Sequence, residues 1–197
     1  MNFALDLSPL LTLSRADFHK LCAANPDRRL ERSPAGTLIV MAPTGGETGN
    51  LNSELNLEVG LWNRQQRTGK LFDSSTGFAL PQGGDRSPDV AWIPLEKWQA
   101  LTPEQRRGFL PLCPDFVIEL LSPSDSWTQG QAKMEEYRDN GCRLGWLLDP
   151  KHKRVAIYRP DRPVELLQAP AVLSGETVLP GFELDLAFLW QGEDYGG

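Results

Sequence analysis

The chain has 197 residues, of which 40% are hydrophobic and 23% charged. This composition is typical of a globular protein with a sizeable core, and the length suits a single domain over residues 1–197. The 20 Lys and Arg residues and the 26 Asp and Glu residues give a formal net charge of −6, which disfavours a protein that coats nucleic acid through a broad basic surface.

Targeting and redox signals are weak. No stretch is long and apolar enough to cross a membrane, and the N-terminal segment lacks the basic residues that precede the apolar part of a signal peptide. Cys22, Cys113 and Cys142 lie far apart and form no CxxC pair. We therefore expect reduced thiols in a cytoplasmic protein that has no contact with a membrane.

The N-terminal half shows alternating helix and strand signals. The expected elements are, in chain order, a helix over 12–25, a hairpin over 30–42 with its turn at 34–36, a helix over 44–67, strands over 70–80 and 87–94, and a helix or ordered loop over 95–109. Thr44 and Glu47 have the spacing of a capping box for the second helix, and Gly69 is placed to end it.

The C-terminal half is richer in strand signals. The expected elements are a strand over 116–121, a helix over 126–140, a hairpin formed by 144–148 and 154–158, and strands over 164–168, 177–179 and 182–184. Ser126 and Gln129 form a second possible capping box, and Gly141 is placed to end that helix. The order of elements predicts an α/β fold with a mixed central β-sheet flanked by helices.

Glu119 interrupts the apolar strand in CPDFVIELLSP, residues 113–123. Because side chains alternate along a strand, Glu119 shares a face with Val117 and Leu121. An ionised carboxylate buried without a partner costs several kcal/mol. One possibility is that Glu119 lies at the strand end, where it reaches solvent or pairs with an Arg. The other is that a bound cation neutralises its charge.

The helix over 44–67 adds acidic residues to this picture. At 100° per residue, the apolar positions that define its core face are Leu51, Leu55, Leu57, Val59, Leu61 and Trp62. Glu47, Glu54 and Glu58 fall inside the same arc. Three carboxylates on a buried stripe indicate a cation or a polar cleft.

Asp89 lies at the start of the strand over 87–94, directly after Pro88. An Asp in this position often accepts hydrogen bonds from nearby backbone amides. Together with Glu119 and the helix carboxylates, it could instead complete a site for Mg²⁺ or Mn²⁺, which prefer oxygen ligands. His19 and His152 lie far apart and outside this set, which disfavours zinc.

Lys133 lies on the helix that follows the Glu119 strand. It shares a face with Tyr137 at a spacing of four residues. It could join the carboxylates, or it could form an ordinary surface ion pair with Glu136 or Asp139.

The segments that carry a resemblance run from about residue 30 to the C-terminus. They are LERSPAGTLIVMAPTGG, SPDVAWIP, PDFVIELLSPSD, the pair Lys133 and Tyr137, GCRLGWLLDP, RVAIYRP and LPGFELDL. With Glu119 30 residues after Asp89 (119 − 89), the chain resembles the PD-(D/E)XK nuclease superfamily. More closely, it resembles a large bacterial family of restriction endonuclease-like proteins of unknown cellular role. The resemblance implies a restriction-endonuclease-like fold with an αβββαβ core and extra β-strands at both ends.

The resemblance also implies a metal-dependent endonuclease that hydrolyses DNA. Asp89, Glu119 and the carbonyl of Leu120 would hold Mg²⁺ or Mn²⁺, and Glu54 or Glu47 would reach the ion through water.

Two positions depart from the pattern of the resembling proteins. The Lys expected two residues after the Glu is Leu121 here, so the resemblance assigns the catalytic role to Lys133. Thr48 stands where the resembling family often has a His.

Two other functions fit the same residues. One is a non-catalytic binding or assembly module, and the other is a metal-dependent hydrolase of small phosphate esters. If the chain cuts both strands of DNA, two copies of the site are needed, so a homo-oligomer is expected.

Overall fold

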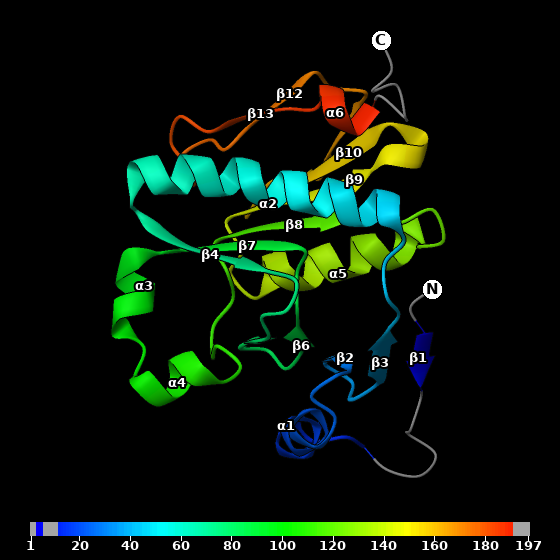
Figure 1. Ribbon diagram of the computed structural model, residues 1–197, viewed down its shortest axis with the longest axis vertical. Helices are drawn as coiled ribbons and strands as arrows, with labels where there is room; N and C mark the ends of the chain where they lie inside the picture. Colours follow the sequence, from blue (N-terminus) through cyan, green and yellow to red (C-terminus); the bar gives the residue numbers. More distant parts are fainter. Residues whose placement is uncertain (1–2, 6–11, 191–197) are drawn as a thin grey trace.

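The computed structural model describes residues 3–5 and 12–190 and is built around a six-stranded central sheet (Figure 1). The strand order is β11-β10-β9-β8-β7-β4, with β4 (Gly69–Asp73), β7 (Val90–Pro94), β8 (Phe116–Leu120), β9 (Leu144–Asp149), β10 (Arg154–Tyr158) and β11 (Glu165–Gln168). β8 and β9 are parallel and the other neighbouring pairs are antiparallel. The predicted mixed sheet is confirmed.

A second sheet, here called the small sheet, lies at one end of the central sheet (Figure 1). Its order is β1-β3-β2-β6-β5, with β1 (Phe3–Leu5), β2 (Arg29–Arg32), β3 (Leu38–Met41), β5 (Phe78–Ala79) and β6 (Asp85–Arg86). The helix α1 (Arg15–Ala24) packs against β2. The strands β12 (Val172–Ser174) and β13 (Glu183–Asp185) form a separate pair.

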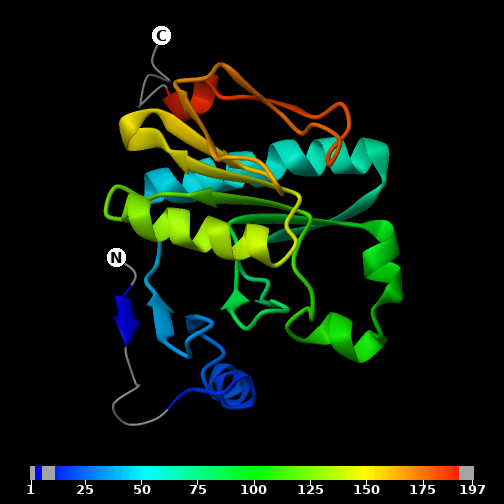
Figure 2. The ribbon, with the colours of Figure 1, turned by 180° about the vertical axis from the view of Figure 1, so that it is seen from behind.

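Two long helices cover opposite faces of the central sheet, α2 (Gly46–Gln66) and α5 (Trp127–Asp139) (Figures 1 and 2). The shorter helices are α3 (Leu95–Ala100), α4 (Pro103–Arg107), the 3₁₀ turn η1 (Pro150–His152) and α6 (Ala187–Trp190). The succession α2, β4, β7, β8, α5, β9 is the predicted αβββαβ core. Among the described residues, no helix is both long and apolar enough to span a lipid bilayer.

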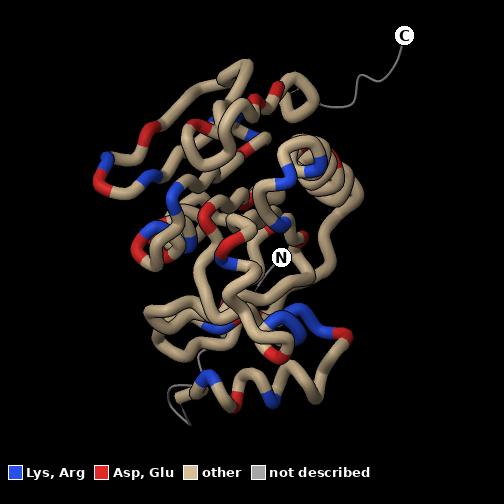
Figure 3. The backbone as a smooth tube through the Cα atoms, turned by 90° about the vertical axis from the view of Figure 1, so that its left-hand side faces the viewer, with Lys and Arg blue, Asp and Glu red and all other residues tan. Residues whose placement is uncertain are grey.

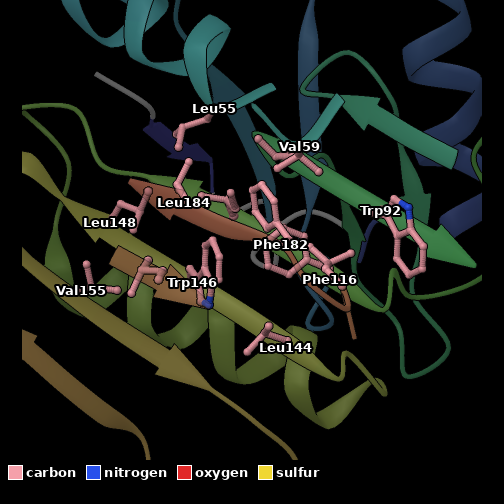
Figure 4. Packing of buried hydrophobic residues seen from close by; sticks show 14 of the residues in the cluster. Leu55, Val59, Trp92, Phe116, Leu144, Trp146, Leu148, Val155, Phe182 and Leu184 are labelled. Atoms are coloured by element: carbon pink, nitrogen blue, oxygen red, sulfur yellow. The ribbon is translucent and has the colours of Figure 1, made fainter. Parts of the chain in front are cut away.

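The alternation along β8 divides the core into two layers. Phe116 and Ile118 pack with Leu55 and Val59 of α2, in a cluster that also includes Phe182 (Figure 4). Val117 lies on the opposite face, in the cluster that includes Met134 and Tyr137 of α5. Glu119 shares the face of Val117, so its carboxylate is directed toward α5.

Several local expectations need correction. α2 is capped at Gly45 without a side-chain hydrogen bond, so the capping box of Thr44 and Glu47 is wrong. The helix ends at Arg67, which takes a left-handed conformation with φ of 57°. Gly69 is needed for another reason, since a Cβ there would overlap the carbonyl oxygen of Ile93.

Two further predictions have opposite outcomes. The Ser126 hydroxyl accepts a hydrogen bond from the Gln129 amide, so the predicted start of α5 is confirmed. Residues 177–179 form a turn rather than a strand, and the partner of β13 is β12.

Candidate functional site

A cavity of about 1080 Å³, here called the main cavity, lies between the small sheet and the end of β8. The N-terminal part of α2 and one side of α5, as far as Glu136, form two of its walls. Its lining includes the side chains of Glu31, Asp89, Glu119 and Lys133 and the residue Leu120. The structure therefore brings together the three main residues predicted from the sequence and adds Glu31.

Strand pairing places Asp89 next to Glu119. β7 and β8 are antiparallel with Val90 opposite Ile118, so the next position along this register sets Asp89 beside Glu119. The Asp89 Oδ2 accepts a hydrogen bond of 2.9 Å from the Leu120 amide. This contact fixes the Asp89 carboxylate at the end of β8. Leu120 is the last residue of this strand, and its carbonyl is the third metal ligand predicted from the sequence.

Lys133 and Tyr137 reach Glu119 from α5. The Lys133 Nζ lies 2.9 Å from Oε1 of Glu119 and 2.9 Å from Oε1 of Glu31. The Tyr137 hydroxyl donates a hydrogen bond of 2.9 Å to the same Oε1 of Glu119. Lys133 is thus directed into the cavity rather than paired along the helix surface with Glu136 or Asp139.

Glu31 connects Lys133 to a further ion pair. The Arg86 guanidinium donates to Oε2 of Glu31 at 3.0 Å and to Oε2 of Glu136 at 2.5 Å. The result is a row of alternating charges, here called the charge row, in the order Glu119, Lys133, Glu31, Arg86 and Glu136. Alternating charges that satisfy one another reduce the cost of burying each of them.

Sequence reasoning missed the position of Glu31. Its strand reads RLER, in which three of the four residues are charged, a composition typical of a solvated strand. Only 2% of Glu31 is exposed, because Arg86, the Ser87 amide and Lys133 of α5 enclose its carboxylate. Burial of this kind comes from tertiary docking and leaves no pattern within the strand itself.

The surroundings raise the pKa values of Glu119 and Asp89 and lower the pKa of Glu31. Burial raises the pKa of Glu119 to about 8, with Asp89 and Glu31 adding to the effect and Lys133 opposing it. Burial also raises the pKa of Asp89. Burial would raise the pKa of Glu31 as well, but the charges of Lys133 and Arg86 outweigh it and lower that pKa. Two adjacent carboxyls with raised pKa values are typical of a site that binds a cation or a proton.

The oxygen donors at the end of β8 fit a hard divalent cation. Mg²⁺ is usually held by one or two carboxylates and keeps several waters, and Asp89, Glu119 and the Leu120 carbonyl can supply that set. Both contacts to Glu119, from Lys133 and Tyr137, fall on Oε1, which leaves Oε2 for a ligand. In the described part of the chain, no three His, Cys, Asp or Glu side chains gather as a metal-binding group. The described lining of the main cavity contains no His or Cys, and its donors are oxygen atoms, which suit magnesium better than zinc.

The face that α2 presents to the main cavity differs from the predicted one. Leu57 and Leu61 are 51% and 42% exposed, so they do not belong to the core face of α2. The predicted core face includes them and is therefore rotated away from the site. Glu54 and Glu58 do not line the main cavity, whereas Glu47 does.

Apart from Glu47, the α2 side chains at the cavity are polar and uncharged. Thr48 and Asn52 line it, and the Asn52 amide nitrogen lies 3.4 Å from Oδ1 of Asp89. The Asn56 amide donates a hydrogen bond of 3.1 Å to the Asp89 backbone carbonyl. Asn52 therefore occupies the place beside Asp89 that the sequence assigns to Glu54.

Comparison with known proteins adds three findings. A solved structure from Anabaena variabilis ATCC 29413, titled as a "putative nuclease belonging to DUF820", has a TM-score of 0.70 at 22% identity, over 82% of this chain and 89% of that one. This likeness shows a restriction-endonuclease-like fold. No curated protein matches the chain. The model of the Uma2 family, described as "Putative restriction endonuclease", matches residues 15–187, so the chain belongs to the Uma2 family, and this membership supports a nuclease type of function.

Proposed function

We propose that this chain is a metal-dependent nuclease that hydrolyses phosphodiester bonds in DNA. The observation that carries the proposal is the convergence of Asp89, Glu119 and Lys133 on one cavity, from two strands and a helix. Membership of the Uma2 family supports the same class of reaction.

The carboxylates of Asp89 and Glu119 and the Leu120 carbonyl would hold Mg²⁺ or Mn²⁺. When bound, the ion would polarise the scissile phosphate and lower the pKa of the attacking water. Hydrogen bonds from the Leu120 amide and the Tyr137 hydroxyl hold the two carboxylates in place before the ion arrives. This preorganisation lowers the cost of gathering like charges around the substrate.

Lys133 would act as a cation that stabilises charge on the phosphate. The two carboxylates beside it raise its pKa, so the ammonium is the form present at neutral pH. An ammonium donates hydrogen bonds and cannot accept a proton. In the reaction Lys133 would therefore orient the water and offset negative charge in the transition state, rather than remove the proton.

Cleavage of plasmid DNA with Mg²⁺ or Mn²⁺ tests the proposal. Asp89→Asn and Glu119→Gln should abolish cleavage while the fold, followed by circular dichroism, is retained. Glu54→Gln is the matched control, since that carboxylate lies outside the main cavity. Unchanged cleavage in either site variant would refute the assignment.

Lys133→Ala separates catalysis from metal binding. We expect a rate loss of about 100-fold or more with Mn²⁺ binding retained in calorimetry. Lys151→Ala removes an exposed lysine from η1 and should cleave at the normal rate. A normal rate in Lys133→Ala would assign Lys133 to a purely structural ion pair.

The charge distribution favours one second candidate, a hydrolase of small phosphate esters. The formal net charge is −6, and acidic and basic positions are interspersed along the backbone in the view of Figure 3. Parallel assays of plasmid, RNA and nucleotides under Mn²⁺ discriminate the two. Hydrolysis of nucleotides alone would favour the second candidate.

A further inference from the structure

A second recess of about 350 Å³, here called the side recess, adjoins the main cavity beside α2. Its lining comprises Arg29, Thr44, Gly49, Asn52, Ser53, Asn56, Asp73 and Ser74. Arg29, Thr44 and Asn52 line both hollows. The two hollows are therefore neighbouring parts of one polar groove. The volume of the side recess is in the range of pockets that hold small ligands.

Arg29 is the cation at the junction. Of the Lys and Arg residues that line either hollow in the described chain, Arg29 alone is exposed. The other two, Arg86 and Lys133, are already held by carboxylates of the charge row. The Arg29 guanidinium also donates a hydrogen bond to the Ser74 carbonyl, which ties it to the rim of the side recess and leaves further donors for an anion.

The side recess also offers acceptors. The Asn52 Oδ1 is buried and has no hydrogen-bond partner among the described residues. The Asp73 carboxylate uses Oδ1 to accept from the amide and hydroxyl of Ser75, so Oδ2 is its remaining oxygen. An exposed Arg and two acceptors that line the same recess match a ligand with one anionic group and an adjoining part rich in N–H or O–H donors.

We propose that the side recess is a subsite for the nucleotide next to the scissile phosphate. Arg29 binds the phosphodiester of that nucleotide, and its sugar and base lie against Asn52 and Asp73. This inference rests on the proposed function, because it takes the ligand to be the strand whose neighbouring phosphate enters the main cavity. It assigns binding of the flanking nucleotide to Arg29 and the polar face of α2. These residues are separate from the carboxylates that would hold the metal.

Binding without metal provides the test. A short fluorescein-labelled single-stranded DNA is titrated with the protein in EDTA, and its anisotropy is recorded at several salt concentrations. Arg29→Gln should weaken the affinity by about tenfold and reduce the slope of log affinity against log salt by about one, as expected for one lost phosphate contact. Arg28→Gln is the matched control, since Arg28 is an exposed neighbour that lines neither hollow.

Two further variants separate charge from structure. Arg29→Lys keeps the charge, so it should retain the salt slope even though it loses the bond to Ser74. Asn52→Leu has a similar size but no acceptor, so it should weaken binding with the salt slope unchanged. Melting temperatures of all variants check the fold.

The subsite is overturned if the wild type does not bind the probe, if Arg29→Gln binds as well as Arg28→Gln, or if Asn52→Leu binds as well as the wild type. The nuclease proposal fails separately, if DNA is bound with this dependence on Arg29 but is never cleaved with Mg²⁺ or Mn²⁺.

Discussion

The Lys133 ammonium lies 2.9 Å from Oε1 of Glu31, and this contact joins α5 to the small sheet. Glu31 is itself held by Arg86 and by the Ser87 amide, which donates a hydrogen bond of 2.9 Å. Lys133 therefore has a fixed position even when Glu119 is engaged by a metal ion. In the proposed reaction Glu31 would be a positioning residue, since it would act through Lys133.

Glu31→Gln should reduce both stability and the cleavage rate. Removing one charge from a buried row leaves Lys133 and Arg86 with one carboxylate each, which costs about 3 kcal/mol of unfolding free energy. Urea denaturation measures this loss. We also expect a fall in kcat of about tenfold or more with little change in KM, because Lys133 loses its orientation but the substrate contacts remain.

Two further variants complete this test. Glu183→Gln makes the same change at an exposed strand position and should alter stability by less than about 0.5 kcal/mol. Glu31→Asp keeps the charge on a shorter side chain and should recover part of kcat. Equal kcat in Glu31→Gln and the wild type would leave Glu31 with a structural role alone.

Metal affinity should depend on pH through Glu119. Its pKa is raised to about 8 in the metal-free protein, so a metal ion must displace a proton at neutral pH. The affinity for Mn²⁺ should rise with pH up to about 8 and then level off. Calorimetry in buffers of different ionisation enthalpy should show about one proton released at pH 7, and a pH-independent affinity would exclude Glu119 as a ligand.

Glu119→Gln should stabilise the metal-free protein at alkaline pH. Because the folded-state pKa of Glu119 is above its ordinary value of 4.5, the folded state holds the proton more tightly. This contribution to stability is fully present below about pH 4.5 and is lost as the pH rises to about 8. In EDTA, the melting temperature of the variant should therefore rise relative to that of the wild type over this pH range. A difference in melting temperature that does not change with pH would contradict the raised pKa of Glu119.

Gly84→Ala should disturb the charge row from its far end. A Cβ at this position would overlap Oε1 of Glu136, whose other oxygen binds Arg86. We expect a loss of about 1–2 kcal/mol in urea denaturation and slower cleavage. Gly108→Ala is the control, since no heavy atom lies within 4 Å of a Cβ placed there, and an equal loss in both variants would exclude this explanation.

The parts of the site that lie on single strands could be predicted from the sequence. Alternation along 116–120 gives the face of Glu119, and Pro88 marks the start of the strand that brings Asp89 alongside it. Lys133 could be assigned only through the resemblance, because its helix also offered surface partners. Which of these partners a long side chain contacts depends on the tertiary structure that surrounds its helix.

The remaining parts could not be predicted, for two physical reasons. Glu31 is buried by tertiary contacts with Arg86 and with Lys133 of α5, both distant from it in the sequence, so its strand keeps a polar pattern. The buried apolar residues of α2 are Leu55, Val59 and Trp62, whereas Leu57 and Leu61 are exposed. A helical-wheel prediction that assigns every Leu to the core therefore directs the helix toward the wrong residues.

Arg86 and Asp89 are three residues apart, yet Arg86 belongs to the small sheet and Asp89 leads into the central sheet. This short connection makes the small sheet a part of the proposed reaction centre, although it contributes none of the proposed metal ligands. If it separated from the central sheet, Lys133 would lose Glu31 while β7 and β8 stayed paired. The protein would keep its main core and the proposed metal ligands, but the proposed catalytic lysine would lose its fixed orientation.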